Sequence, residues 1–452
     1  MFQIILALLV ILVVARLILR GYKAEPVLLL AGLLLMAATQ LFGWGKILPS
    51  SVPSTGIAAL DGFEVIRDLF SSRAAQLGMM IMALMGFAHY MDHIGANAAV
   101  VRVATKPLKN LRSPYALLFC SYLLASALQL AIPSATGLAV LLMGTMFPIM
   151  LGLGLSAGSA AGVIATSLAV AYTPTAIDAI RGAAAVQQDV VQYVLFSQGP
   201  AALVTVLLMG IVHIFWQRHC DRQEGFVPQP AAVSEGEKQG APALYACLPM
   251  LPIVMAVGSS QLFVQGIRLD VTTIVLISMA ICMLLELIRL RDAKQVCAGF
   301  DVFLKGMGQA FTGVVGLLVA AGVFAHGIKV CGAIDVLIEL ALHVGLPPFA
   351  MAVVFAIVTF AAAMVMGSGN APFLAFVELI PQIASSMGAN AVSMILPMQQ
   401  ASHMGRAVSP VSGVIIAVSS AANLTPFAVV KRTMVPVVAG LVIHTIIIGV
   451  FY

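Results

Sequence analysis

Two short polar segments interrupt apolar stretches of this chain, and they constrain its fold more than any other feature. One is Met366 to Phe373 (MGSGNAPF), and the other, at the corresponding place in the first half of the chain, is Ile132 to Gly137 (IPSATG). Inside a bilayer, irregular backbone persists only where protein or a water-filled cavity satisfies its N–H and C=O groups. Matched interruptions in the two halves of a chain are therefore typical of the binding site of a transporter.

The composition places these interruptions in a membrane protein. Of the 452 residues, 61% are hydrophobic and only 9% are charged, which is far from the balance of a soluble domain. Apolar runs at 2–19, 26–42, 77–94, 271–288 and 436–451 are long enough to cross a hydrocarbon core of about 30 Å as helices. Their polarity is continuous rather than alternating, which argues against a β-barrel. The predicted fold class is an all-α polytopic membrane protein.

Charge and cysteine content limit the partners of the chain. The net charge of +5 comes from Lys and Arg in short loops between apolar runs, so membrane topology explains it better than nucleic acid does. The six cysteines lack metal-ligand spacing, so we expect no metal and no cofactor other than a coupling Na⁺ or H⁺. Arg16, Arg20 and Lys23 follow the first apolar run, which predicts a retained helix with a periplasmic N-terminus.

Four landmarks recur in the same order in the two halves of the chain. They are GFEV at 62–65 with GFDV at 299–302, FAH at 87–89 with FAH at 324–326, Ser134 with Ser368, and Pro174 with Pro410. The spacing between the two members is nearly the same for every pair. An ordered series at nearly constant spacing indicates an internal repeat.

Loop charges predict that the two repeats are inverted. The loop at 97–114 carries four basic residues and no acid, whereas its counterpart at 327–347 carries Lys329 against Asp335 and Glu339. By the positive-inside rule these loops lie on opposite sides of the membrane. We expect five crossings plus one re-entrant hairpin in each half, and both termini in the periplasm. The expected hairpin arms are 115–132 with 138–155, and 348–366 with 371–388.

These features predict three parts. They are a first inverted repeat at 1–217, with scaffold helices at 1–96 and a hairpin and broken helix at 115–190; a cytoplasmic linker at 218–243; and a second repeat at 244–452, with scaffold helices at 244–330 and a hairpin and broken helix at 348–430. The linker is rich in Gly, Pro, Ser, Gln and Glu and has too few apolar residues to form a core.

The two hairpin tips and two broken helices are expected to meet in one cavity near the membrane midplane. Pro174 and Pro410 each remove a backbone donor and displace the preceding residue from helical conformation. The helices that start after the breaks present free N–H groups and a positive dipole end, which suits anions. The alternative is that the breaks are kinks packed between helices. The expected substrate-binding residues are Ser134, Ala135, Thr136, Gly137, Thr173, Pro174, Thr175, Gly367, Ser368, Gly369, Asn370, Arg406, Ser409, Pro410 and Ser412.

Few charged residues lie within apolar sequence. Arg406 is the best candidate to pair with an anionic substrate, because a cation at membrane depth is costly and usually functional, with a structural ion pair or a snorkelling helix end as the alternative. Asp178 is a candidate carrier of a coupling proton or sodium ion, with a local pair to Arg181 as the alternative role. Glu378 is a second coupling candidate, and His403 lies on the same helix face as Arg406, where it can tune that site.

His89 and His93 lie four residues apart beside Asp92. This spacing fits a proton relay or a metal site. Because the sequence offers no clear third ligand and a basic loop follows, an interfacial cluster is the favoured interpretation.

Five longer motifs carry a family resemblance. They are LGMMIM at 77–82, HIGAN at 93–97, SATG at 134–137, GSGNAPF at 367–373 and GRAVSPVSGV at 405–414. These motifs resemble the DcuC family of anaerobic C4-dicarboxylate carriers of bacterial inner membranes, and the resemblance runs essentially end to end. It implies transport of succinate, fumarate and malate, usually as succinate efflux, by a dimer with elevator-type alternating access. His403 stands where the resemblance implies an asparagine.

Other functions were weighed against a dicarboxylate carrier. The same fold can carry a monocarboxylate, a tricarboxylate or an acidic amino-acid derivative. A channel fits paired hairpins and broken helices less well than alternating access does. An intramembrane serine protease with Ser368 as nucleophile and His403 as base does not explain the inverted halves, so no enzymatic activity is expected.

Overall fold

The computed structural model describes residues 2–20, 22–49, 52–111, 113–227, 241–259, 269–332 and 347–452. Within these ranges every regular element is a helix, in agreement with the predicted all-α class. The predicted linker lies partly outside them, at 228–240, and α11 (Gly199–Gln223) extends into its first residues. Most of the predicted loop at 327–347, with Asp335 and Glu339, also lies outside the described residues.

The helices of the first half end at α11, and those of the second half begin at η5. The first half contains α1 (Phe2–Leu19), α2 (Ala24–Phe42), α3 (Asp61–Arg73), α4 (Met79–His93), α5 (Ala96–Thr105), α6 (Pro114–Leu128), α7 (Ala135–Gly152), α8 (Ala157–Ala165), α9 (Ile177–Ala185) and α10 (Val190–Gln192). The second contains η5 (Ala243–Met250), α12 (Leu251–Gly258), α13 (Val271–Leu290), α14 (Ala293–Ala310), α15 (Gly316–Val330), α17 (Pro348–Met366), α18 (Ala371–Phe376), α19 (Ile380–Ser386), α20 (Ala391–Ala407), α21 (Gly413–Ala421) and α22 (Pro426–Phe451).

Seven helical stretches among the described residues are long and apolar enough to cross a membrane. They are Ala24–Phe42, Ala135–Gly152, Val190–Gln223, Val271–Leu290, Ala293–Val330, Pro348–Met366 and Pro426–Phe451. Each has the length that a helix needs to span a hydrocarbon core. The chain is a multi-pass membrane protein.

All four interruptions that the sequence predicted are breaks between helices. Residues 129–134 separate α6 from α7, and 367–370 separate α17 from α18. Residues 166–176 separate α8 from α9, and 408–412 separate α20 from α21. The second hairpin differs from its expected form, because the arm at 371–388 is two short helices, α18 and α19. Glu378 lies in the turn between them, where two arginines bind it.

The order of elements is similar in the two halves. At a nearly constant spacing along the chain, α6 recurs as α17, α7 as α18, α8 as α20 and α9 as α21. A single π-helical turn precedes α4 at Ala74–Gly78, and another precedes α15 at Phe311–Val315, the corresponding place in the second half. This recurrence is what an internal repeat predicts. The inverted relation of the halves and the elevator movement stay predictions.

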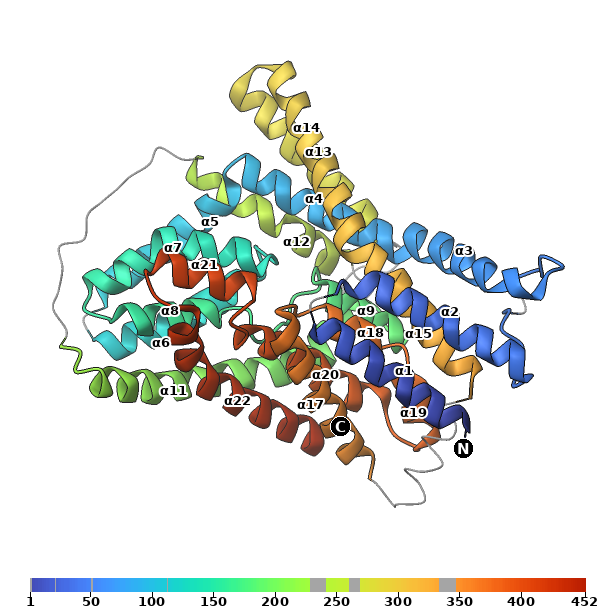
Figure 1. Ribbon diagram of the computed structural model, residues 1–452. Helices are drawn as coiled ribbons and strands as arrows, with labels where there is room; N and C mark the ends of the chain where they lie inside the picture. The colour runs from blue at the N-terminus through green and yellow to red at the C-terminus, as the bar shows by residue number, and fades with distance from the viewer. Residues whose placement is uncertain are drawn as a thin grey trace.

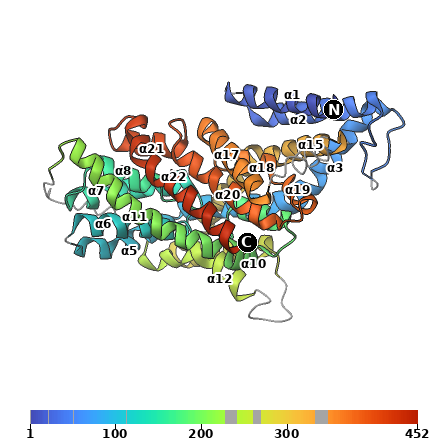
Figure 2. The same ribbon diagram turned by 90° about the horizontal axis from the view of Figure 1, so that it is seen from below.

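Figure 1 shows how the helices are arranged. α13 and α14 form a hairpin that projects from the rest of the molecule, and α5, α6, α7, α8 and α21 gather at the end opposite α1, α2 and α3. α11 and α22 run side by side along one edge. In Figure 2, α1 and α2 form an outer layer. α9, α18 and α20 lie between the two ends.

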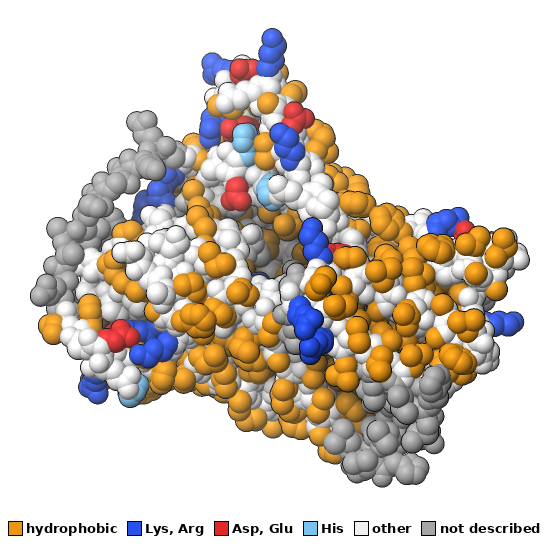
Figure 3. Space-filling view, viewed as in Figure 1, with side chains coloured by type: hydrophobic (Ala, Val, Ile, Leu, Met, Phe, Trp, Pro, Cys, Tyr) orange, Lys and Arg blue, Asp and Glu red, His pale blue; other side chains and the backbone are white. Residues whose placement is uncertain are grey.

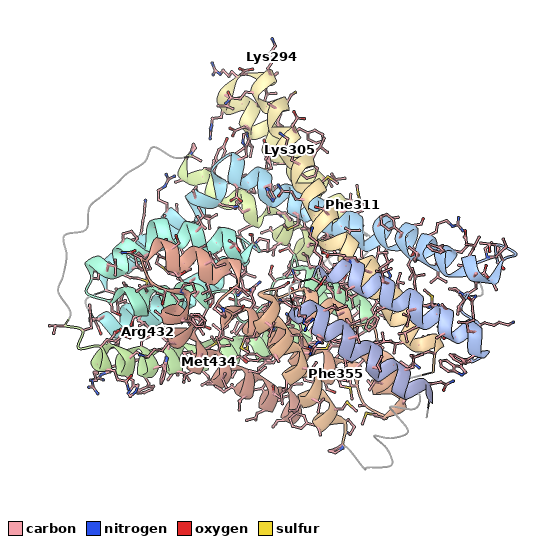
Figure 4. The ribbon with its side chains drawn as sticks, viewed as in Figure 1. Lys294, Lys305, Phe311, Phe355, Arg432 and Met434 are labelled. Carbon is pink, nitrogen blue, oxygen red and sulfur yellow. The ribbon has the colours of Figure 1, made fainter. Side chains whose placement is uncertain are left out.

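Charged and apolar side chains occupy different parts of the surface. Leu9 and Leu12 of α1 and Leu30 and Leu34 of α2 are exposed, and Figure 3 shows a largely hydrophobic surface over these helices. Lys and Arg side chains gather at the tip of the α13–α14 hairpin, where Figure 4 labels Lys294. This separation is the pattern expected of a surface in contact with lipid.

Helices from the two halves approach closely at glycines. A Cβ atom added to Gly306 of α14 would lie 2.9 Å from the Cα of Gly86 in α4. A Cβ added to Gly327 of α15 would lie 2.7 Å from the carbonyl oxygen of Gly32 in α2. Such backbone contacts stabilise membrane helix pairs by van der Waals packing, because lipid gives little hydrophobic drive between helices.

A buried ion pair joins the last helices of the two halves. Arg432 of α22 is 1% exposed, and its Nη1 donates to Asp221 Oδ1 of α11 at 2.7 Å. Asp221 also accepts from the hydroxyls of Ser156 and Ser159 at 2.6 and 2.8 Å, and Arg432 also binds Glu224. Figure 4 shows Arg432 beside α8 and α11. A charge is tolerated in such a position only when its partners satisfy it.

We expect Gly306→Ala to destabilise the protein by about 1–3 kcal/mol, the usual cost of overpacking, because the methyl group would strike Gly86. Gly308→Ala, two residues along the same helix, is the matched control, because its Cβ would meet nothing within 4 Å. That change should be neutral or stabilising by up to about 1 kcal/mol. Thermal unfolding of the two variants in detergent measures the difference, and equal unfolding temperatures would contradict the close contact.

Candidate functional site

A cavity of about 60 Å³ lies among the helix breaks. Its lining comes from α4, the first hairpin, the segment at 166–176, the start of α9, the tip of the second hairpin and the end of α20. The face shown in Figure 3 is hollowed next to α4, below the α13–α14 hairpin. Segments far apart in the sequence therefore surround one cavity.

Five of the candidate residues line this cavity. They are Thr173, Thr175, Asp178, Asn370 and Arg406. The other twelve lie outside its lining: Ser134, Ala135, Thr136, Gly137, Pro174, Gly367, Ser368, Gly369, Glu378, Ser409, Pro410 and Ser412. The breaks thus contribute unequally, and the second broken helix reaches the cavity through the last turns of α20.

Three of the candidate serines cap the helices that follow the breaks. The hydroxyl oxygens of Ser134, Ser368 and Ser412 accept the backbone N–H of Gly137, Ala371 and Ile415, at 3.2, 3.3 and 3.2 Å. Such caps satisfy one of the N–H groups that a helix start leaves free. These oxygens are therefore engaged in local structure, although each hydroxyl proton can still be donated.

Both hairpin tips pack against the second break. A Cβ added to Gly367 would lie 3.0 Å from the Cα of Ser412, and one added to Gly413 would lie 3.1 Å from Thr136 Oγ1. Gly367 also has φ of +67°, a conformation that favours glycine. The tips consequently lie near each other, and each contributes one residue to the cavity lining, Pro133 and Asn370.

Arg406 and His403 present their polar ends to the cavity from successive turns of α20. Arg406 Nη2 donates to the carbonyl oxygen of Leu168 at 2.9 Å, which orients the guanidinium. A Cβ added to Gly369 would lie 3.0 Å from both Arg406 Nη1 and His403 Nδ1. The absence of a side chain at Gly369 therefore lets the hairpin tip approach both groups closely.

Asp178 is buried beside them. Its side chain is 1% exposed, and its Oδ2 lies 3.0 Å from His403 Nε2. Gln399 Nε2 donates to the same oxygen at 2.6 Å, and Tyr193 donates to Gln399 Oε1 at 2.8 Å. The local Asp178–Arg181 pair that the sequence suggested as an alternative is not formed, because Arg181 binds Glu378 instead.

Glu378 lies outside the cavity and ties three segments together. Arg73 Nη2, at the end of α3, donates to Glu378 Oε2 at 2.6 Å, while Arg73 Nη1 and Arg181 Nη2 both bind Oε1. Both carboxylate oxygens are thus occupied by guanidinium groups. This arrangement suits a structural ion pair better than a carrier of coupling ions.

The histidines of α4 are also separate from the cavity. His89 packs on Gly306 of α14, and Asp92 accepts from the amide of Asn97. Among the described residues, no group of three or more His, Cys, Asp or Glu side chains is placed to hold a metal ion. The interfacial cluster favoured from the sequence stays a prediction.

Comparison with known proteins identifies the family. The sequence model of the DcuC family, described as C4-dicarboxylate anaerobic carrier, matches residues 2–452. The chain belongs to the DcuC family. The anaerobic C4-dicarboxylate transporter DcuC of Escherichia coli K12 is 44% identical over 441 residues, covering 98% of this chain and 95% of that protein. The probable DcuC transporter of Vibrio cholerae is 42% identical over 450 residues, covering 99% and 97%.

Two solved transporter structures share the fold of this DcuC-family chain. MtrF of Neisseria gonorrhoeae, described as illuminating a class of antimetabolite efflux pumps, aligns with a TM-score of 0.56 at 12% identity, covering 94% of each chain. The YdaH transporter of Alcanivorax borkumensis aligns with a TM-score of 0.56 at 13% identity, covering 95% of this chain and 99% of that one. At such identities the likeness concerns the fold alone.

Buried glutamines are the site residues that sequence reasoning missed. Gln129 Nε2 donates to Val170 O at 3.0 Å, and Gln198 and Gln400 both donate to Ala171 O, at 2.8 and 2.6 Å. Gln400 Oε1 also accepts the N–H of Ala171 at 2.9 Å. In the break at 166–176, between α8 and α9, these amides supply hydrogen bonds that a continuous helix would have made itself. The sequence did carry a signal for these glutamines, because an amide side chain in an apolar run is costly unless it is hydrogen-bonded.

Removing the Glu378 carboxylate tests its structural role in this DcuC-family chain. Glu378→Ala leaves Arg73 and Arg181 unpaired, with side chains only 18% and 8% exposed. We expect a loss of about 3–5 kcal/mol in unfolding free energy, the usual effect of breaking a buried pair. Glu64→Ala is the matched control, since its partner Arg67 is 67% exposed and the loss should be about 0–1 kcal/mol.

Unfolding in detergent compares these two variants with the unmodified protein. A Glu378→Gln protein of unchanged stability that had lost ion-coupled transport would instead assign Glu378 to coupling.

Proposed function

We propose that this chain is a secondary active carrier that moves C4-dicarboxylates such as succinate, fumarate and malate across the bacterial inner membrane, with succinate efflux or exchange as its main role. The observation that carries the proposal is the Arg406 guanidinium, which lines the central cavity of a DcuC-family chain. The curated relatives are named anaerobic C4-dicarboxylate transporters, and this supports a C4 diacid over another organic anion.

The chemistry of the cavity suits a carboxylate ligand. Arg406 supplies a guanidinium that can hold a carboxylate with two hydrogen bonds. Asn370, Thr173 and Thr175 supply neutral amide and hydroxyl groups along the same lining. Charge-assisted hydrogen bonds in a site shielded from water are stronger than those at the surface. Together these groups favour an anion over an apolar or cationic substrate.

The helix breaks suit a carrier that changes its access. The two hairpin tips, which enclose Gly137 and Gly367, lie against the second break, so a movement of the hairpins would open or close the region beside Arg406. We propose inverted repeats, alternating access of the elevator type and periplasmic termini on the grounds given by the sequence. A homodimer surrounded by lipid completes the proposed assembly.

Coupling to an ion gradient is part of the proposal. Of the two coupling candidates, Asp178 is favoured to take part in coupling, because it lines the cavity and is buried. Glu378 is the weaker candidate, since two arginines occupy both of its oxygens. A proton or a sodium ion is the expected co-substrate, and no other cofactor or enzymatic step is needed.

Counterflow in proteoliposomes tests the function. Vesicles loaded with unlabelled succinate should take up labelled succinate in a saturable manner, and fumarate or malate should inhibit that uptake. Arg406→Ala should weaken binding by about 1.5–3 kcal/mol, the scale for hydrogen bonds to charged groups, which lowers uptake at subsaturating succinate at least tenfold. Lys294→Ala, at the exposed tip of the α13–α14 hairpin, is the control and should transport normally.

Absence of counterflow in the unmodified protein would refute the proposed substrate. Unchanged succinate affinity in Arg406→Ala would remove that residue from the site.

Gly369→Ala tests the close approach of the second hairpin tip to Arg406 and His403. The added Cβ would lie 3.0 Å from Arg406 Nη1 and from His403 Nδ1, so it would displace both groups or occupy ligand space. We expect a loss of succinate affinity of about tenfold or more, or 1.4 kcal/mol, without loss of folded protein. Gly144→Ala in α7 is the control, because its Cβ would meet nothing within 4 Å. Binding is measured by calorimetry, and equal affinities of the two variants would contradict the assignment.

A further inference from the structure

The Asp178–His403 pair has an arrangement that the proposed anion site does not by itself require. His403 is 6% exposed and Asp178 is 1% exposed, and their facing atoms, Nε2 and Oδ2, are 3.0 Å apart. We propose that His403 takes up one proton together with the substrate, and that the resulting imidazolium binds the second carboxylate of the diacid through Nδ1–H. This inference rests on the proposed dicarboxylate function and deepens it.

The neighbours of the His403 ring determine which nitrogen receives the proton. Nε2 lies 3.0 Å from Asp178 Oδ2, and a carboxylate oxygen can only accept, so a nitrogen at that distance is best satisfied when it carries the hydrogen. In neutral His403 the other nitrogen, Nδ1, is therefore the basic one. Among the described residues, neither ring nitrogen of His403 has a hydrogen-bond partner, and both atoms are buried; Nε2 faces Asp178 Oδ2, whereas no acceptor is recorded for Nδ1. A proton added to Nδ1 would need an acceptor, and a ligand carboxylate supplies one.

The position of Nδ1 relative to Arg406 suits a ligand with two carboxylates. Arg406 Nη1 and His403 Nδ1 each lie 3.0 Å from the same point, the Cβ that Gly369 lacks. Both residues and Asn370 also line the same cavity. A short diacid near Gly369 can thus place one carboxylate on Arg406 and the other on His403.

The charges around His403 favour uptake of a single proton. Within the part of the chain that the structure describes, the charged groups recorded beside His403 are Asp178 from α9 and Arg406 from its own helix, and their charges cancel when His403 is neutral. The second hairpin contributes Gly369 and Asn370, and Tyr193 reaches Asp178 only through Gln399, so these elements add no charge. A bound dianion leaves two uncompensated negative charges, and one proton on His403 reduces them to one. In a site of low dielectric constant this reduction is strongly favourable.

The proton balance of transport follows directly. A proton from the water on the loading side joins Nδ1 as the diacid binds, travels with it, and leaves on the other side when the carboxylate departs. Asp178 acts as a positioning residue, because it holds the Nε2–H tautomer and stabilises the imidazolium without touching the substrate. No redox or covalent step is involved.

Proton uptake on binding is measured with purified protein in weakly buffered detergent solution containing a pH dye, between pH 6.5 and 8. Addition of succinate should consume up to one proton for each ligand bound, and succinate affinity should fall up to tenfold per pH unit as pH rises. Succinamate, in which one carboxylate is an amide, should bind more weakly and consume no proton. No proton uptake by the unmodified protein at any pH in this range would overturn the inference.

Variants then assign the proton to His403. His403→Asn should bind succinate with an affinity that does not depend on pH, should consume no proton, and should discriminate little between succinate and succinamate. Asp178→Asn should retain uptake but shift the fall in affinity to lower pH, because the imidazolium loses its anionic partner. His89→Asn, on α4 outside the cavity, is the control and should behave as the unmodified protein. Proton uptake that persists in His403→Asn would overturn the assignment.

The same experiment separates this inference from the proposed function. If the unmodified protein shows no saturable succinate binding or counterflow at any pH, the proposed substrate fails. If it binds succinate and exchanges it but takes up no proton, the carrier function stands and only the role of His403 fails.

Discussion

The architecture depends on one constraint, which is that a broken backbone inside an apolar protein needs other groups to satisfy its N–H and C=O groups. In the break at 166–176 the chain meets this need with three side-chain amides. Those of Gln129, Gln198 and Gln400 donate to the backbone carbonyl oxygens of Val170 and Ala171. These glutamines come from three different segments of the chain, so the break can exist only when those segments are packed together. The cavity is therefore a product of the tertiary fold and cannot form in either hairpin alone.

Close glycine contacts and buried ion pairs also stabilise this arrangement of helices. Glycines allow α4 to touch α14, and α2 to touch α15, at the backbone, while the guanidinium of Arg432 joins α22 to α11. Glu378 connects α3 to α9 through Arg73 and Arg181. Buried ion pairs contribute little net stability but are costly to break. They consequently favour one relative placement of the helices over alternatives that would leave a charge unpaired.

The electrostatics of the cavity follow from the same packing. Arg406 and His403 lie one turn apart on α20, and Asp178 comes from α9 to neutralise one positive charge. The positive charge of Arg406 and the negative charge of Asp178 thus offset each other in the cavity lining. Glu378 shows how the setting of a carboxylate changes its role, because a similar group outside the cavity, bound by two arginines, serves as a structural tie.

The helical membrane class, the four breaks and the family can be read from the sequence, because apolar length, paired polar interruptions and long motifs are local properties of the chain. Arg406 and Asp178 also stand out there, since charged residues are rare in apolar sequence. The partner of each charged group is visible only in the folded protein, where Asp178 lies beside His403 and Arg181 binds Glu378. The tertiary structure likewise separated the candidates that line the cavity from the serines that cap helices. These pairings join residues from opposite halves of the chain, and no local pattern specifies them because they arise from the packing of distant helices.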